Sequence, residues 1–211
     1  GSSLVGSEMC IRDSILYWLL IAKPLKQSYL IALAFNAGLF LSGASWVYVS
    51  IHEFGYASPL LASLLTILFC GGIAAINAAS LCCFALIPAN RQKQLIGIMC
   101  FAGIATASES IRAWVLTGFP WLNIGYSQTD APLSGYAPIF GVYGISFLIY
   151  LLGALCVDIC GNRQASLYRI GKTQSRGIAL VTTIVLGGLA LQQVSWTTIS
   201  DRPQRVAMIQ A

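Results

Sequence analysis

The chain alternates between long apolar runs and short polar interruptions. The apolar runs cover residues 28–51, 59–87, 94–115, 139–160 and 177–196. A helix needs about 20 mainly apolar residues to cross the hydrocarbon layer of a bilayer. The runs are continuous, whereas the strands of a membrane β-barrel alternate in polarity. The pattern therefore predicts an all-α membrane protein, a polytopic transmembrane helix bundle with about five complete spans.

The two ends of the chain differ from this pattern. Residues 1–14, GSSLVGSEMCIRDS, have no apolar periodicity, and we interpret them as a non-native or artefactual segment. Residues 15–22 are too short to span a membrane and resemble the tail of a helix, so the transmembrane domain is expected over 15–200. Residues 201–211 combine a charged linker with a short apolar run, which predicts the opening strand of a truncated soluble domain.

One long stretch, residues 108–138, is neither purely apolar nor strongly charged. It reads SESIRAWVLTGFPWLNIGYSQTDAPLSGYAP and holds three prolines, several glycines and two tryptophans. Tryptophan and tyrosine rings favour the boundary between acyl chains and headgroups. The stretch is therefore predicted to be a shaped loop at the membrane surface.

Composition excludes a soluble protein. Hydrophobic residues make up 57% of the 211 residues and charged residues only 9%, and the mean hydropathy is +0.76. A soluble domain carries about 25% charged residues. The net charge of +5 comes from short loops without a basic stripe interleaved with aromatics, which argues against a nucleic-acid partner.

The distribution of basic residues predicts the orientation. If the loop after residue 22 is cytoplasmic, alternation of spans places eight Lys and Arg on that side and three on the other, with Arg12 set aside. The eight are Lys23, Lys26, Arg91, Lys93, Arg163, Arg169, Lys172 and Arg176, and the three are Arg112, Arg202 and Arg205. Because cytoplasmic loops are enriched in Lys and Arg, we expect the 108–138 loop and the C-terminus to face the periplasm.

Few residues have the spacing that catalytic or metal chemistry requires. The seven cysteines lie almost wholly in apolar runs without a CxxC pair, which is typical of small packing residues. His52 is the only histidine, and with Glu53 beside it a solvated loop pair is the simpler interpretation. No P-loop, dinucleotide fingerprint or GxSxG motif is present. We therefore predict no catalytic residue, metal site or cofactor within this chain.

Glu109 and Arg112 lie three residues apart, on one face of the third apolar run. An ionisable pair at membrane depth is costly unless it is satisfied, so it marks a functional or packing-critical site. The pair could be a structural ion pair that pins the loop to the helix, or it could hold a substrate headgroup; a catalytic role is a third possibility. Asn77 in the second run is expected to bond to a neighbouring helix.

The aromatic part of the loop also has two interpretations. Phe119, Trp121, Tyr126 and Gln128 could form the floor of a lipid-binding cleft, with the rings against an acyl chain and the polar groups toward an ester or phosphate. They could equally be an aromatic belt that anchors helix ends. Trp196, at the outer end of the last run, is first of all an interfacial anchor.

Four motifs together identify a family resemblance. Residues 109–112 (ESIR), 114–121 (WVLTGFPW) and 125–128 (GYSQ), with 43–51 (GASWVYVSI), resemble bacterial apolipoprotein N-acyltransferase. With the order of spans and the VAMIQ strand, the similarity covers about residues 15 to 211. The resemblance implies an enzyme of the bacterial inner membrane with a periplasmic nitrilase-like domain.

The resemblance also implies the reaction and its residues. The family moves an acyl chain from a phospholipid to the α-amino group of the diacylglyceryl-cysteine of an apolipoprotein, through a thioester on a cysteine. Its Glu, Lys and Cys lie in the nitrilase-like domain, and none of the seven cysteines here matches the nucleophile, so this polypeptide alone is expected to be inactive. Substrate contacts are expected from Trp121, Tyr126 and Trp196, and loop positioning from Trp46, Glu109, Arg112 and Gln128.

From the residues alone, two other classes compete with this interpretation. A small transporter or channel subunit would show internal repeats and ionisable groups along a path, and the chain has no convincing repeat. A non-catalytic membrane scaffold is the third class.

Overall fold

The computed structural model describes residues 2–115, 118–163 and 172–197, and the side chains of these residues outside 2–10, 162–163 and 172–174. Over these ranges the chain is helical, with no strand. The main helices are α1 (Ser2–Leu20), α2 (Leu25–Gly43), α4 (Pro59–Leu81), α6 (Leu95–Arg112), α7 (Ala137–Arg163) and α8 (Lys172–Leu191). Short helical segments connect them: α3 (Trp46–Val49), η1 (Ser50–Phe54), η2 (Cys82–Leu86), α5 (Ala89–Gln92), η4 (Ile124–Gln128) and η5 (Pro132–Tyr136). The predicted all-α class is confirmed.

Three segments of the described chain are long and apolar enough to cross a membrane: Pro59–Leu86, Leu95–Arg112 and Pro132–Gly161. They correspond to the second, third and fourth predicted spans. The first predicted span is divided into α2 and the α3–η1 segment, which meet at a bend of 52°, and it makes a fourth crossing if the pair counts as one. The last, Ser175–Leu191, is a shorter apolar helix. Hydropathy reports composition along the chain but not the direction of the backbone, so it did not show the bend.

The α1 helix crosses the predicted boundary at residue 15. Its backbone is helical from Ser2, and Asp13 is 1% exposed and forms a 2.9 Å ion pair with Arg12. Leu16 and Tyr17 are buried in the main core. The α1 helix is therefore continuous across residue 15, and the predicted domain boundaries and the artefactual origin of residues 1–14 stay predictions. The predicted linker and strand at 201–211 lie outside the described residues.

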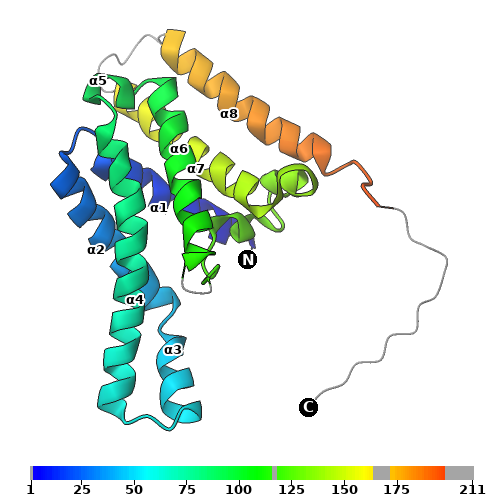
Figure 1. Cartoon of the computed structure of the whole chain (residues 1–211). Coiled ribbons are helices and arrows are strands. Elements are labelled where there is room, and N and C mark those ends of the chain that lie inside the picture. Colours follow the sequence, from blue (N-terminus) through cyan, green and yellow to red (C-terminus); the bar gives the residue numbers. More distant parts are fainter. Residues whose placement is uncertain (1, 116–117, 164–171, 198–211) are drawn as a thin grey trace.

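The main core is built by aromatic and aliphatic side chains from α1, η2, α6 and α7. Phe101 on α6 lies at its centre, with ring centroids 4.9 Å from Tyr17, 5.5 Å from Phe84 and 6.2 Å from Tyr150. A smaller cluster joins α2 to α4 through residues that include Phe40, Cys70 and Ala74. Figure 1 shows α3 and the first half of α4 extending beyond the other helices.

A polar chain crosses the bundle between these clusters. The Asn77 amide on α4 donates to Asn36 Oδ1 on α2 at 3.2 Å, and the Ser108 hydroxyl on α6 donates to Asn77 Oδ1 at 2.9 Å. All three side chains are buried. The expected bond from Asn77 to a neighbouring helix is confirmed, and it links three helices because an amide offers both a donor and an acceptor.

The α8 helix is seated on the loop. The Tyr136 hydroxyl of η5 donates to Ile184 O at 2.9 Å, and the Gln192 amide donates to Ala131 O and Ser134 Oγ, both at 2.8 Å. A Cβ on Gly135 would collide with the carbonyl oxygen of Gly188, so only glycine lets the two backbones approach this closely.

Gln92 forms buried hydrogen bonds near the N-terminal end of α6, which is the end away from the loop. Its side chain is 1% exposed; its amide nitrogen donates to Ile87 O at 2.7 Å and its Oε1 accepts from Ala22 N at 2.8 Å. The Tyr17 hydroxyl donates to its backbone oxygen at 2.8 Å. One buried glutamine therefore connects the end of α1 to the turn before α6.

We expect Gln92→Leu to lower the free energy of unfolding by about 1 to 3 kcal/mol, because it removes the hydrogen bonds that this buried side chain makes to Ile87 O and Ala22 N. Denaturant titration in detergent, followed by circular dichroism, measures the change. Gln94→Leu is the matched control, since Gln94 is exposed. Equal stability of the two variants would contradict the role of Gln92.

Candidate functional site

Hydrogen bonds hold two parts of the described loop between α6 and α7 in shape. Directly after α6, Phe119 N donates to Arg112 O at 3.0 Å. Further on, the Ser127 hydroxyl donates to Ile124 O at 2.7 Å and the Thr129 hydroxyl to Tyr126 O at 2.9 Å, which stabilise η4. The loop is thus a shaped segment, as the mixture of glycine, proline and aromatic residues predicts.

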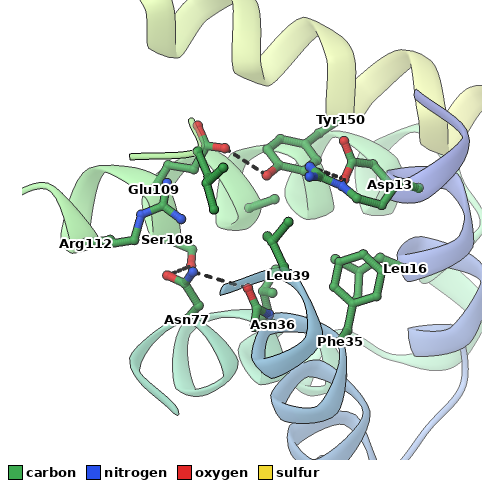
Figure 2. Close-up of a pocket in the computed structure, with 14 residues that line it drawn as sticks. Asp13, Leu16, Phe35, Asn36, Leu39, Asn77, Ser108, Glu109, Arg112 and Tyr150 are labelled. Carbon is green, nitrogen blue, oxygen red and sulfur yellow. Dashed lines mark hydrogen bonds and ion pairs between the residues drawn. The ribbon is translucent and has the colours of Figure 1, made fainter. Parts of the chain in front are cut away.

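The Glu109 carboxylate binds the middle of this loop. It is 4% exposed, and its Oε1 accepts from Ile124 N and from the Tyr150 hydroxyl, both at 3.0 Å. Its Oε2 accepts from the Ser146 hydroxyl at 2.7 Å. Figure 2 shows Glu109 and Tyr150 facing each other across the bundle interior. One carboxylate therefore joins α6, α7 and the loop.

Arg112 binds the same loop by a separate contact. Its guanidinium donates to Asn123 Oδ1 and lies 5.2 Å from the centre of the Phe40 ring. Arg112 Nε is buried without a hydrogen-bond partner among the described residues. No Arg112 nitrogen lies within 4.0 Å of a Glu109 oxygen. Of the interpretations given for these residues, the direct ion pair is therefore not formed: Arg112 bonds to Asn123 on the loop, and Glu109 bonds to Ile124 on the loop and to Ser146 and Tyr150 on α7.

Aromatic and aliphatic contacts hold the other side of the loop. The Trp46 and Trp121 rings meet edge to face at 5.6 Å, and the Phe69 and Phe119 rings do so at 5.0 Å. Leu122 packs on Gly43 at the end of α2, where an added Cβ would lie 2.6 Å from a Leu122 methyl group. Leu122 also has a positive φ of 62°, a conformation that costs energy in a non-glycine residue and that the surrounding contacts must impose.

Two cavities adjoin the loop. The larger, of about 700 Å³, is open to one side and mainly apolar. The smaller, of about 20 Å³, has room for about one water molecule. Its wall includes Asn36, Asn77, Ser108, Glu109, Arg112 and Tyr150, which Figure 2 labels. The larger is lined by Arg12, Leu39, Phe119, Pro120, Trp121, Leu122, Asn123, Ile124, Tyr126 and Ser127.

Comparison with known proteins agrees with the motifs. A family model described as "Apolipoprotein N-acyltransferase N-terminal domain" matches residues 13–155. The chain belongs to the apolipoprotein N-acyltransferase family.

Relatives named apolipoprotein N-acyltransferase come from several bacteria. The chain is 40% identical to the protein of Pseudomonas syringae pv. tomato over 176 residues, which are 83% of this chain and 34% of the relative. It is 35% identical to the protein of Nitrosomonas europaea over 185 residues, 87% of this chain and 35% of the relative. The chain thus spans about a third of the length of these relatives. Their shared name disfavours the transporter or channel alternative.

The structure of this N-acyltransferase family member brings together some of the expected substrate residues. Trp121 and Tyr126 both line the large cavity and are 53% and 63% exposed. Trp196, 48% exposed, follows the end of α8 and is not among the described residues that line the cavity. Gln128 is 7% exposed and donates to Ser127 Oγ at 3.3 Å, so it lies inside the loop and not on the cavity wall.

The remaining polar candidates lie elsewhere. His52 Nε2 is 4.0 Å from Glu53 Oε1, and its Nδ1 is 2.8 Å from Ala57 O, in the turn between η1 and α4. The described residues hold no group of three or more His, Cys, Asp or Glu that could bind a metal ion. Among the described residues, the buried polar contacts of the candidate side chains are therefore concentrated around the α6–α7 loop.

Sequence reasoning missed the residues that complete this arrangement. Ser146 and Tyr150 contact Glu109 from α7, and Asn123 contacts Arg112 from the loop. Ser146 and Tyr150 are spaced i, i+4 in an apolar span, and this spacing places two hydroxyls on one helix face. That spacing was the available signal.

Proposed function

We propose that this chain is the membrane domain of an enzyme that transfers a phospholipid acyl chain to the α-amino group of the diacylglyceryl-cysteine of apolipoproteins. The large cavity carries the proposal: its volume of about 700 Å³ lies in the range of ligand sites, about 300 to 1,000 Å³. Phe119, Trp121 and Leu122 offer an apolar wall for an acyl chain. Tyr126 and Ser127 offer hydroxyls for an ester or phosphate.

The same proposal includes an arrangement in the bacterial inner membrane. The bent α2 to η1 segment makes one span and α8 makes the fifth, which places the α6–α7 loop on the periplasmic side. The eight-to-three excess of Lys and Arg on the opposite side supports this orientation. Impermeant labelling of a Tyr126→Cys variant in intact cells tests it. Labelling only after the inner membrane is opened would show that the loop faces the cytoplasm.

Within this proposed function, the candidate residues divide into those that contact substrate and those that hold the loop. Trp121 and Tyr126 contact the lipid, and Trp196 serves the substrate side where the chain leaves α8. Glu109, Arg112, Trp46 and Gln128 hold the loop in shape, and the bonds of Glu109 to Ile124 and of Arg112 to Asn123 support this division.

Photo-crosslinking tests the lipid site directly. A phospholipid with a photoactivatable group near the end of its acyl chain is added to the purified chain in detergent, and adducts are mapped by mass spectrometry. We expect adducts on residues 119–127 that an excess of unlabelled phospholipid removes. Adducts on outer helix faces alone, without competition, would overturn the proposal.

Trp196→Ala is expected to reduce kcat/KM for acyl transfer by about tenfold in a full-length enzyme carrying this domain, which corresponds to about 1.4 kcal/mol of transition-state stabilisation. Membrane insertion should be unchanged, because one interfacial tryptophan does not determine a five-span bundle. Trp18→Ala is the matched control, since Trp18 is 64% exposed on α1. Wild-type turnover of the Trp196 variant would exclude a substrate role.

A further inference from the structure

Ser146 and Tyr150 form a hydroxyl pair on α7 whose partners lie on another helix. The residues are one helical turn apart and are 0% and 8% exposed. Both hydroxyls reach Glu109 on α6, Ser146 at 2.7 Å and Tyr150 at 3.0 Å. Neither residue lines the large cavity among the described residues, so any effect on a ligand there must pass through the loop.

The hydrogen positions follow from the number of donors. Gly125 N donates to Ser146 Oγ at 3.0 Å, so the single hydrogen of the Ser146 hydroxyl is directed at Glu109 Oε2. Glu109 Oε1 receives Ile124 N–H and the Tyr150 hydroxyl. Two consecutive loop amides, 124 and 125, therefore end at the same carboxylate, one directly and one through Ser146.

The backbone of the loop lies close to α7 at Gly125. A Cβ on Gly125 would collide with Val142 O and lie 3.0 Å from Ser146 Oγ. On the opposite side, Leu122 is packed on Gly43, and Trp121 lies against Trp46. The cavity wall at 119–124 is thus held by apolar contacts at Trp121 and Leu122 and by polar contacts to Glu109 and Arg112.

We infer that Ser146 and Tyr150 are positioning residues that set the shape of the large cavity, and with it the fit of an acyl chain, by holding the loop through Glu109. The part that concerns lipid rests on the proposed function. Removal of the Ser146 hydroxyl leaves Gly125 N without its acceptor, and removal of the Tyr150 hydroxyl takes a hydrogen bond from the Glu109 carboxylate that binds Ile124 N. The cavity wall at 119–124 is therefore expected to move while the helices keep their positions.

Hydrogen exchange measured by mass spectrometry tests the contact in the chain itself. Ser146→Ala combined with Tyr150→Phe is expected to speed amide exchange in residues 119–131 by about tenfold, since two hydrogen bonds to the Glu109 side chain that holds the loop are lost. Exchange in α6 and α7 should stay at wild-type rates.

Two controls separate this effect from a general loss of stability. Tyr17→Phe removes a buried tyrosine hydroxyl at the opposite end of the bundle, where it bonds to Gln92 O. Thr106→Ala removes a hydroxyl on α6 that bonds only within its own helix, to Ala102 O. Neither should speed exchange in the loop. Unchanged loop exchange in the double variant, or equal acceleration throughout the bundle, would overturn the inference.

Competition in the photo-crosslinking assay then tests the effect on lipid. The double variant should need about tenfold more unlabelled phospholipid to suppress adducts on 119–127. In the full-length enzyme the same change should raise KM for the phospholipid with kcat within about twofold of wild type, because it alters binding and no reacting group. Wild-type competition and KM despite fast loop exchange would overturn the role in lipid fit. Absence of competed adducts in the wild-type chain would instead refute the proposed function, and the exchange rates would still decide the contact.

Discussion

Glu109→Ala is expected to destabilise the bundle by at least about 3 kcal/mol, because three buried donors lose their acceptor at about 1 kcal/mol or more each. The donors are Ile124 N, the Ser146 hydroxyl and the Tyr150 hydroxyl. The loss should exceed that of any other single carboxylate among the described residues of the loop and α6.

Denaturant titration in detergent measures this change, and Glu53→Ala is the matched control. The Glu53 side chain is 65% exposed, and its closest approach to His52 is a long 4.0 Å. Its removal should therefore change stability by less than about 0.5 kcal/mol. Glu109→Gln should fall between the two, since an amide keeps one acceptor for Ile124 N. A Glu109→Ala variant as stable as Glu53→Ala would show that the carboxylate does not hold the loop.

Gly125→Ala is expected to detach the loop and to abolish competed lipid crosslinking at residues 119–127. The added methyl group would meet the carbonyl oxygen of Val142, which is backbone and cannot turn aside, and would lie 2.8 Å from Val142 Cγ2. Overpacking of this kind costs about 1 to 3 kcal/mol. The least costly response is displacement of the loop, with loss of the bond from Gly125 N to Ser146.

Gly38→Ala is the matched control for this glycine. Gly38 lies within α2, where an added Cβ would have no neighbour within 4 Å. In a helix interior alanine is favoured over glycine by about 0.5 to 1 kcal/mol, so this variant should be as stable as wild type or more so. Crosslinking by Gly125→Ala at the level of Gly38→Ala would contradict the close contact with α7.

Glu109 and Arg112 show how much of the site could be predicted from the local sequence pattern. Glu109 and Arg112 stood out because ionisable residues are rare in apolar spans, and the structure places both against the loop. Their spacing of three residues on one helix face suggested a mutual pair, yet each bonds instead to a segment 11 to 15 residues further along the chain. Spacing along a helix gives proximity between side chains, whereas the choice of partner depends on what the neighbouring segments offer.

The bend after α2 and the position of α8 also depend on contacts between segments that are distant in the chain. Hydropathy located both apolar runs, but α2 and α3–η1 meet at 52° where Leu122 of the loop packs on Gly43. The position of α8 depends on the close approach of Gly135 to Gly188 and on the bonds of Gln192 to η5. These contacts join residues that are distant in the chain, and no local pattern contains them.

The amino-acid sequence by itself determined the all-helical membrane class, the position of the α6–α7 loop along the chain and the apolipoprotein N-acyltransferase family, because continuous apolar runs and long motifs are properties of the chain read in order. Only the tertiary structure decided that Glu109 bonds to Ile124, Ser146 and Tyr150, that Trp121 and Tyr126 share a cavity, and that Trp196 is not among the described residues that line it. The physical reason is that these relations are distances between segments brought together by packing, and a carboxylate or an aromatic ring binds whichever complementary group the packing places beside it.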